Sequence, residues 1–315
     1  MALIYDVGMN TCEDSAFYLN KGHTVIAIEA IPDLVEAAMN RFEEMASSGR
    51  FTALNVAIAE NASERDFWIC DDLSAFSSLH RPLANRDGRK HHAIRIKCIR
   101  FRDILARFGV PHYLKIDIEG SDAFCLKDLD RNNLPPFVSV EAGCEGNEPL
   151  SSGEDGVDHL TNLNHLCRCG YNRFKLVSQH SLLPISRSNL EYAADPEYRQ
   201  MVRDQIERDI GWRFPHGSSG PWGNEIPGPW MNYSEAREVY LACREAFFLK
   251  YKDARFHMFW FWFDWHATTL SRADLASLKS HTDRNRQAKD YTTLRPSVTN
   301  TPVIETYRGD SNQRR

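Results

Sequence analysis

Short apolar runs alternate with helix-like segments along the first 180 residues of the chain. The runs are rich in branched side chains, and the segments between them place apolar residues three and four positions apart. Strands are predicted at residues 2–8, 23–30, 51–59, 112–120, 136–143 and 173–179, with two extra strands at 65–70 and 93–99 around a polar loop. This alternation predicts an α/β protein whose parallel sheet is doubly wound through right-handed crossovers.

The pattern changes after residue 180. Two helical stretches, at about 195–209 and 234–250, flank a loop rich in Gly, Pro and Ser. The run "HMFWFWFDWHA" then alternates with period two and predicts the last core strand, within 256–271. We therefore expect a helical and loop insertion at 181–255, before the last strand, which covers the site as a substrate lid. Residues 272–315 are polar with few aromatic side chains and predict a mostly flexible tail.

Composition narrows the class of protein. The 315 residues are 42% hydrophobic and 26% charged, as in an ordinary soluble domain, and the net charge of −5 gives no support for nucleic-acid binding. The most apolar run, "MFWFWF", is too short to span a membrane. The start of the chain does not resemble a signal peptide, and the scattered cysteines lack zinc-ligand spacing, so we expect a reduced, cytoplasmic protein.

Polar residues that could carry chemistry fall at the ends of the predicted strands. Ligands bind at the carboxyl ends of strands in open α/β sheets. Glu29 follows Asp6 by 23 residues and ends the second strand, the position from which a carboxylate accepts both hydroxyls of a ribose. The full set comprises Asp6, Gly8, Asn10, Glu29, Asn55, Asp117, Glu119 and Glu141.

The first turn discriminates between two cofactors. A dinucleotide fingerprint needs glycines at two positions that Asn10 and Glu13 occupy here. A pyrophosphate requires several bare backbone amides, whereas S-adenosylmethionine has no phosphate and needs one close backbone approach with polar partners. One glycine between Asp6 and Asn10 therefore favours S-adenosylmethionine over NAD. The alternative interpretation is a tight turn at Gly8 with Asp6 as a helix cap.

Several stretches together carry a family resemblance. "DVGMN", "VIAIEAIP", "LNVAI", "YLKIDIEGSD", "VSVEA" and "GYNRFKLVSQ" resemble the FkbM family of S-adenosylmethionine-dependent methyltransferases over about residues 3–180. The resemblance implies a Rossmann-like class I methyltransferase sheet and O-methyl transfer to a sugar, glycan or natural-product hydroxyl. The cofactor residues expected are Asp6, Gly8, Asn10, Glu29, Ala30, Asn55 (near the adenine) and Val56. Cys12 departs from the family pattern, since many members carry a second glycine there.

Asp117 and Glu119 are the predicted catalytic residues. If the strand stays extended, both side chains point to one face, so that one carboxylate could remove the acceptor proton while the other orients the substrate or cofactor. Alternatively, Asp117 caps the next helix and Glu119 pairs with Lys115. No histidine is placed beside these acids and Glu141, so we expect no metal ion.

The acceptor-binding residues are predicted less directly. Asp264 and His266 share a face of the last strand and could contact the acceptor, although this strand also fits a core strand packed on both faces. The substrate residues predicted are Glu141, His80, His216, Trp222 and His266. The expected partner is a small-molecule or glycan acceptor. An NAD-dependent Rossmann enzyme and a non-catalytic nucleotide-binding module of the same fold remain as alternative functions.

Overall fold

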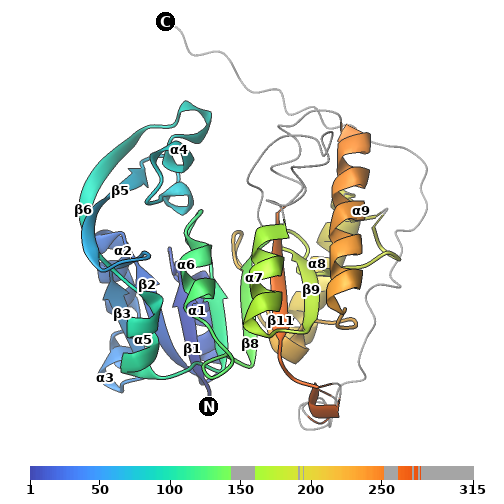
Figure 1. The fold of residues 1–315 in the computed structure, drawn as a ribbon, viewed down its shortest axis with the longest axis horizontal. Helices are drawn as coiled ribbons and strands as arrows, with labels where there is room; N and C mark the ends of the chain where they lie inside the picture. Colours follow the sequence, from blue (N-terminus) through green and yellow to red (C-terminus); the bar gives the residue numbers. More distant parts are fainter. Residues whose placement is uncertain are drawn as a thin grey trace, which may run out of the picture.

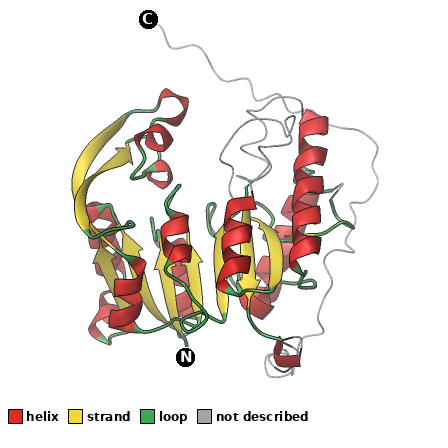
Figure 2. Ribbon diagram, viewed as in Figure 1, coloured by secondary structure: helices red, strands yellow, loops and turns green. Residues whose placement is uncertain are grey.

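The computed structural model contains an 8-stranded sheet and a separate 3-stranded sheet. It describes residues 1–142, 160–190, 192–193, 195–251, 262–271, 273–275 and 277. Helices cover both faces of the large sheet, whose strand order is β10-β9-β11-β8-β7-β1-β2-β3 (Figures 1 and 2). The predicted α/β fold class is confirmed.

The element bounds follow the predicted alternation closely. The large sheet contains β1 (Leu3–Val7), β2 (Thr24–Glu29), β3 (Phe51–Asn55), β7 (Tyr113–Ile116), β8 (Phe137–Glu141), β9 (Arg173–Ser178), β10 (Pro184–Ile185) and β11 (Phe263–Thr268). The helices around it are α1 (Glu13–Asn20), α2 (Pro32–Arg41), α3 (Glu43–Ser47), α5 (Phe101–Phe108), α6 (Asp122–Lys127), α7 (Thr161–Cys169), α8 (Pro196–Ile210) and α9 (Tyr233–Tyr251).

The strand order reverses beside β1, which pairs in parallel with β2 on one side and with β7 on the other. A reversal of this kind opens a crevice beyond the carboxyl ends of the strands. Two strands depart from the predicted parallel sheet: β11 runs antiparallel between β8 and β9, and β10 runs antiparallel to β9. Because β11 enters from the opposite direction, its first residues lie at the carboxyl edge of its neighbours.

The predicted third strand is two strands in different sheets. The chain turns after β3, where the amide of Val56 bonds to the carbonyl of Leu54, and β4 (Ala57–Ile58) then pairs with β6 (His91–Ile99). β6 also pairs antiparallel with β5 (Ser63–Cys70). The sequence did not predict this division, because the apolar run from 51 to 59 is continuous and apolar content alone does not show which sheet a residue joins.

β5, β6 and the loop that joins them form a polar arm, residues 63–99. The loop contains the short helix α4 (Arg81–Ala84) and the 3-10 turns η1 (Ser74–Phe76) and η2 (Arg86–Gly88). Figure 1 shows the arm rising beyond the carboxyl ends of β1, β2 and β3, with α4 at its top. The arm therefore stands on the side of the sheet where a ligand would bind.

Two hydrophobic layers enclose the large sheet. α1, α2 and α8 contribute to one core cluster, and α5, α6, α7 and α9 contribute to the other. The insertion thus places α8 on one face and α9 on the opposite face. Between them, η4 (Gly223–Glu225) follows Trp222, whose ring stacks on Tyr113 at 4.8 Å between centroids. This part of the insertion packs against the sheet as a core layer.

A row of polar side chains crosses the face of the sheet beneath α1 and α8. The strand registers align Asp6, Lys115, Ser139, His266 and Lys175. None of these residues is more than 4% exposed. A buried polar row needs partners for every member, and two of the members obtain theirs from outside the row. Lys175 Nζ donates to the carbonyls of Ile226 and Pro227, and Ser139 Oγ hydrogen-bonds to the Tyr113 hydroxyl.

The packed part of the chain extends past residue 272, where the tail was predicted to begin. Leu275 is buried in the core cluster beneath α1 and α8, and its carbonyl accepts a hydrogen bond from Asn224. Residues 278–315, most of the predicted tail, lie outside the described part of the chain, as does the start of the predicted last strand, residues 256–261. No helix among the described residues is long and apolar enough to cross a membrane.

Candidate active site

The turn between β1 and α1 is built for close backbone contact. The amides of Gly8 and Met9 both donate to the carbonyl of Ile28, which ties the turn to the end of β2. Gly8 has a φ of +83°, and a Cβ there would lie 1.7 Å from the carbonyl oxygen of Asp117. Only glycine fits this position. Cys12 also has a left-handed φ of 61°, a conformation that glycine would adopt without strain.

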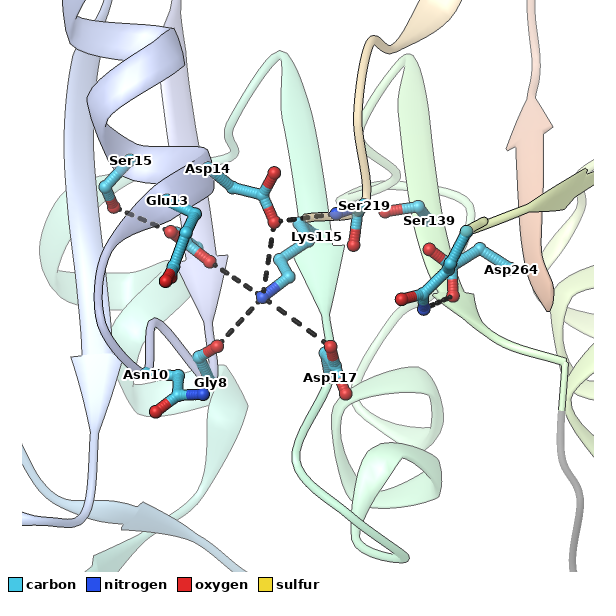
Figure 3. A network of polar contacts seen from close by, with 12 residues as sticks. Gly8, Asn10, Glu13, Asp14, Ser15, Lys115, Asp117, Ser139, Ser219 and Asp264 are labelled. Carbon is cyan, nitrogen blue, oxygen red and sulfur yellow. Dashed lines mark hydrogen bonds and ion pairs between the residues drawn. The ribbon is translucent and has the colours of Figure 1, made fainter. Parts of the chain in front are cut away.

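Lys115 lies at the centre of a buried ionic network (Figure 3). Its Nζ donates to the carbonyl of Gly8 at 2.8 Å and lies 3.2 Å from Asp6 Oδ1. The carboxylates of Asp14 and Asp117 each lie 3.8 Å from the same nitrogen. Burial alone would lower the pKa of Lys115, but Asp6, Asp117 and Asp14 together raise it above the ordinary lysine value. The ammonium therefore stays charged and holds the turn against β7.

Asp6 supports the turn from beneath. It has no exposed surface, and its second oxygen accepts a hydrogen bond from the Ser15 hydroxyl at 2.6 Å. A side chain with no free surface does not touch a ligand in this conformation. Asp6 is thus placed to support the Gly8 turn through Lys115, and the cofactor contact predicted for it stays a prediction.

Glu29 and its neighbours form the second part of the site. One Glu29 oxygen accepts the amide of Asn10 and the other accepts the amide of Ile31, both at 2.9 Å. Asn55 donates from Nδ2 to the carbonyls of Glu29 and Ala30. Burial raises the pKa of Glu29, and the backbone donors oppose this shift. The structure thus brings together the predicted residues Asn10, Glu29, Ala30 and Asn55, and Val56 follows them in the chain.

The geometry expected for Asp117 and Glu119 is wrong. β7 ends at Ile116, and Glu119 has a φ of 47° in a turn, so the two side chains do not alternate along an extended strand. The reason is the Glu119-Gly120 pair, since both residues take positive φ. Asp117 faces Lys115, whereas Glu119 pairs with Arg86 of the arm. Burial, opposed by Arg86, raises the pKa of Glu119.

The arm supplies contacts that the sequence did not reveal. Ser74 Oγ donates to Asn10 Oδ1, Ser78 Oγ donates to the carbonyl of Glu119, and Arg86 pairs with the Glu119 carboxylate. Arg86 also lies over the ring of Phe76, 4.0 Å from its centroid. The polar loop and its Asp-Gly turn signal were visible in the sequence, but nothing there indicated that the loop reaches the first turn and the end of β7.

Further acids lie beside Asp117 at the carboxyl edge. Glu141 ends β8 and is the register partner of Asp264, the second residue of β11. Asp264 Oδ1 accepts a hydrogen bond from Gln179 Nε2 at 2.8 Å. Burial, reinforced by the Asp117 charge, raises the pKa of Asp264 to about 7. Burial raises the pKa of Glu141 well above its ordinary value. The negative charges of four neighbouring acids add to the shift: Glu119, Asp117, Asp122 and Asp264.

Four predicted substrate residues are dispersed. His266 is 1% exposed within the buried row, and burial lowers its pKa to about 3, so it is neutral and covered. Trp222 packs on Tyr113 and His112 at the amino end of β7, opposite the site. His80 begins α4 in the arm, two residues after Ser78. His216 lies in the insertion, beside His180 and Trp262.

The described residues contain no group of three or more His, Cys, Asp or Glu side chains arranged to hold a metal ion. The acids near Asp117 are instead arranged around the Lys115 ammonium and the Arg86 guanidinium.

The strand order, the antiparallel β11 and the site at the switch point define a Rossmann-like methyltransferase fold. Residues 6–172 match the family described as the methyltransferase FkbM domain, which is more than half of the chain. The protein therefore belongs to the FkbM methyltransferase family.

Comparison with solved structures gives weaker likenesses. The crystal structure of methyltransferase FkbM from Methylobacillus flagellatus KT is 19% identical, covers 56% of this chain and 40% of that one, and gives a TM-score of 0.38. The crystal structure of the [4+2]-cyclase SpnF is 11% identical, covers 85% of this chain and 74% of that one, and gives 0.34. This chain thus spans less than half of the first structure. Among curated proteins, no match was found. The family assignment depends on the domain match alone.

Replacement of Lys115 by methionine tests the ionic network. The variant leaves three carboxylates without their buried counter-ion, and we expect the free energy of unfolding at pH 7.5 to fall by about 3–5 kcal/mol. The deficit should shrink at pH 5, because burial raises the pKa of Asp14 to about 7 and its protonation removes part of the repulsion. Urea denaturation at both pH values measures it. Arg95→Met, which breaks the exposed pair with Asp66, is the control and should cost less than about 1 kcal/mol. A pH-independent loss would contradict the network.

Asp264 should make stability fall as the pH rises. Its raised pKa means that the folded state keeps a proton that the unfolded state releases between about pH 4 and pH 7, so folding weakens across that window. Asp264→Asn keeps the acceptor for Gln179 and removes this titration. Relative to the wild type, the variant should gain up to about 4 kcal/mol at pH 8 and nothing at pH 4. Thermal and urea unfolding across this range test it, with the exposed Asp66→Asn as control. An equal shift at all pH values would refute the assignment.

Proposed function

We propose that this protein is an S-adenosylmethionine-dependent methyltransferase that acts on a hydroxyl of a sugar, glycan or natural product. The observation that carries the proposal is the pairing of one constrained glycine turn with the Glu29 carboxylate at the switch point. Gly8 is the only glycine of this turn, whereas a pyrophosphate-binding turn needs several. The turn and the carboxylate suit a nucleoside with no phosphate.

The residues at the site fit the cofactor. A carboxylate oxygen accepts two hydrogen bonds, and each Glu29 oxygen receives one from the backbone. Each oxygen therefore retains capacity for a ribose hydroxyl. Ala30 and Val56 offer apolar surface next to the Asn55 amide, a suitable setting for an adenine. These neighbouring groups come from the ends of β2 and β3, as a nucleoside site at this crevice requires.

Bound S-adenosylmethionine supplies an electrophilic methyl group on its sulfonium. The protein must then place an acceptor oxygen in line with that methyl group and receive the hydroxyl proton. Asp117 suits the proton-accepting role, because it follows β7 beside the Gly8 turn and retains partial exposure, with a side chain 25% exposed. Glu119 is bound to Arg86 and suits positioning of the arm or of the acceptor. Lys115 contacts both the Asp117 carboxylate and the Gly8 carbonyl. It therefore fixes the proposed base, Asp117, relative to the turn that binds the cofactor.

The product S-adenosylhomocysteine tests cofactor binding. At a hundred times its Kd it should stabilise the fold by about 2.7 kcal/mol. Glu29→Gln keeps the shape of the side chain but replaces one acceptor by a donor, so we expect binding to weaken by about 1.5–3 kcal/mol. Thermal unfolding measures the stabilisation, and isothermal titration calorimetry measures the change in affinity. Glu36→Gln, on the exposed face of α2, serves as the matched control. Stabilisation by NAD without any response to S-adenosylhomocysteine would contradict the proposal.

Two amide variants separate the roles of the acids. Asp117→Asn should lower kcat by a factor of about 10² to 10⁴, because a general base acts in the transition state. Glu119→Gln weakens the pair with Arg86 and should raise the acceptor KM more than it lowers kcat. Methyl transfer from radiolabelled S-adenosylmethionine, measured with S-adenosylhomocysteine titrations on the same samples, distinguishes these outcomes. Normal turnover by Asp117→Asn would exclude it as the base, and lost cofactor binding would place it at the methionine end.

A further inference from the structure

Three ring side chains gather at the carboxyl edge of β9, beyond the acids of the site. His180 follows β9, His216 lies in the insertion loop, and Trp262 precedes β11. The ring centroids of His180 and His216 are 6.1 Å apart, and those of Trp262 lie 5.8 Å from His180 and 5.9 Å from His216. Three separate segments of the chain therefore meet in one aromatic cluster.

The cluster is continuous with the candidate active site. Asp264 is the register partner of Glu141 on β8, and Ile116, the residue before Asp117, is the register partner of Val140, so Asp117, Glu141 and Asp264 follow one another along the carboxyl edge of the sheet, across β7, β8 and β11. Asp264 is in turn held by Gln179, the residue before His180, at 2.8 Å. The amide of Gln179 also donates to the carbonyl of Trp262 at 3.0 Å. The cluster thus begins at His180, next to the residue that binds Asp264, on the same edge of the sheet.

Arg203 of α8 holds the segments of the cluster together. Its Nη1 donates to the carbonyls of Gln179 and His180 at 3.2 and 3.1 Å. Its Nη2 donates to the carbonyls of Phe214 and Pro215 at 2.6 and 3.1 Å. A side chain only 13% exposed thus binds the residues before His216 to those around His180, and Glu207 fixes its guanidinium. Only the planar fork of arginine presents donors to both segments at once.

The three rings are not accounted for by core packing. Trp262 belongs to none of the core clusters among the described residues, and it is half-buried, as is His180, whereas His216 is exposed. A Cβ at Gly217 would lie 4.0 Å from the Trp262 ring, so the backbone of the loop passes beside the indole. Partly exposed aromatic rings next to carboxylates are a combination that suits ligand binding.

We infer that His180, His216 and Trp262 form the acceptor-binding wall of the enzyme, which takes a hydroxylated ring, with Arg203 as its positioning residue. This inference rests on the proposed function. The indole face receives the apolar C–H face of the ring, and the imidazoles exchange hydrogen bonds with its hydroxyls. The ring hydroxyl to be methylated then extends toward Asp117, past Asp264. Specificity for the acceptor comes from the insertion, while the cofactor is bound by the first half of the chain.

A residue-resolved binding experiment tests the wall. The full chain, which has 7 tryptophans, is labelled with 5-fluorotryptophan and saturated with S-adenosylhomocysteine. Fluorine resonances are assigned through Trp262→Phe and Trp222→Phe. Methyl glycosides of common hexoses and deoxyhexoses, together with myo-inositol, are added one at a time. We expect at least one of them to shift the Trp262 resonance and to leave that of Trp222, at the opposite edge, unchanged.

Kinetics of methyl transfer to the ring with the largest shift provide the second readout. Trp262→Ala should lower kcat/KM for that acceptor by about ten-fold, mainly through KM, and Trp262→Phe should restore most of the loss. Arg203→Lys should raise the acceptor KM as well. The matched control is Arg208→Lys, an exposed arginine on the same helix, which should leave KM unchanged. The affinity for S-adenosylhomocysteine should change less than twofold in all of these variants.

The outcomes separate the two proposals. If S-adenosylhomocysteine does not bind, the proposed function fails. If it binds but no ring in the panel moves the Trp262 resonance, or if Trp262→Ala methylates the ring as efficiently as the wild type, the acceptor wall is wrong and the proposed function stands. A loss in kcat for Arg203→Lys with an unchanged acceptor KM would show a general structural role and overturn its positioning role.

Discussion

One buried cation governs the geometry of this molecule. The Lys115 ammonium lies among Asp6, Asp14 and Asp117 and also binds the carbonyl of Gly8. Desolvation of one charge costs several kcal/mol, and the cost is offset only when opposite charges and hydrogen bonds surround it. The strands β1 and β7, the first turn and α1 must therefore keep their relative positions. Asp14 extends this constraint to the insertion, because its carboxylate accepts the amide of Ser219.

The sequence predicted the features that depend on local pattern. Alternating apolar runs indicated most of the strands, and Gly8 and Glu29 were recognised because a turn and a strand end constrain the residue types allowed there. Features that depend on distant contacts were not predictable. The chain turns at Glu119, although the sequence pattern predicted that the strand continues there. Ser74 and Arg86 contact the site because of the fold of the arm. Trp222 packs on Tyr113, far from the acids. Polar residue type alone did not distinguish His266, which is buried, from His216, which is exposed.

The site is built from two unlike halves. The half around Gly8, Glu29 and Asn55 is formed by backbone turns and strand ends, where side chains are fixed by short-range hydrogen bonds. The half around His180, His216 and Trp262 is formed by segments distant in sequence, which Arg203 and β11 help to hold together. A division of this kind allows the second half to change its ligand preference while the first half keeps its shape.

The position of β11 has a consequence for how the chain folds. β8 and β9 share no hydrogen bonds with each other in this sheet, and each pairs with β11, a strand about 85 residues further along than β9. During synthesis, both strands present unpaired edges until residue 263 has left the ribosome, and such edges are prone to aggregation. Contacts so distant in sequence also slow folding. A fragment ending near residue 180 would therefore lack the strand that lies between β8 and β9 in its own sheet.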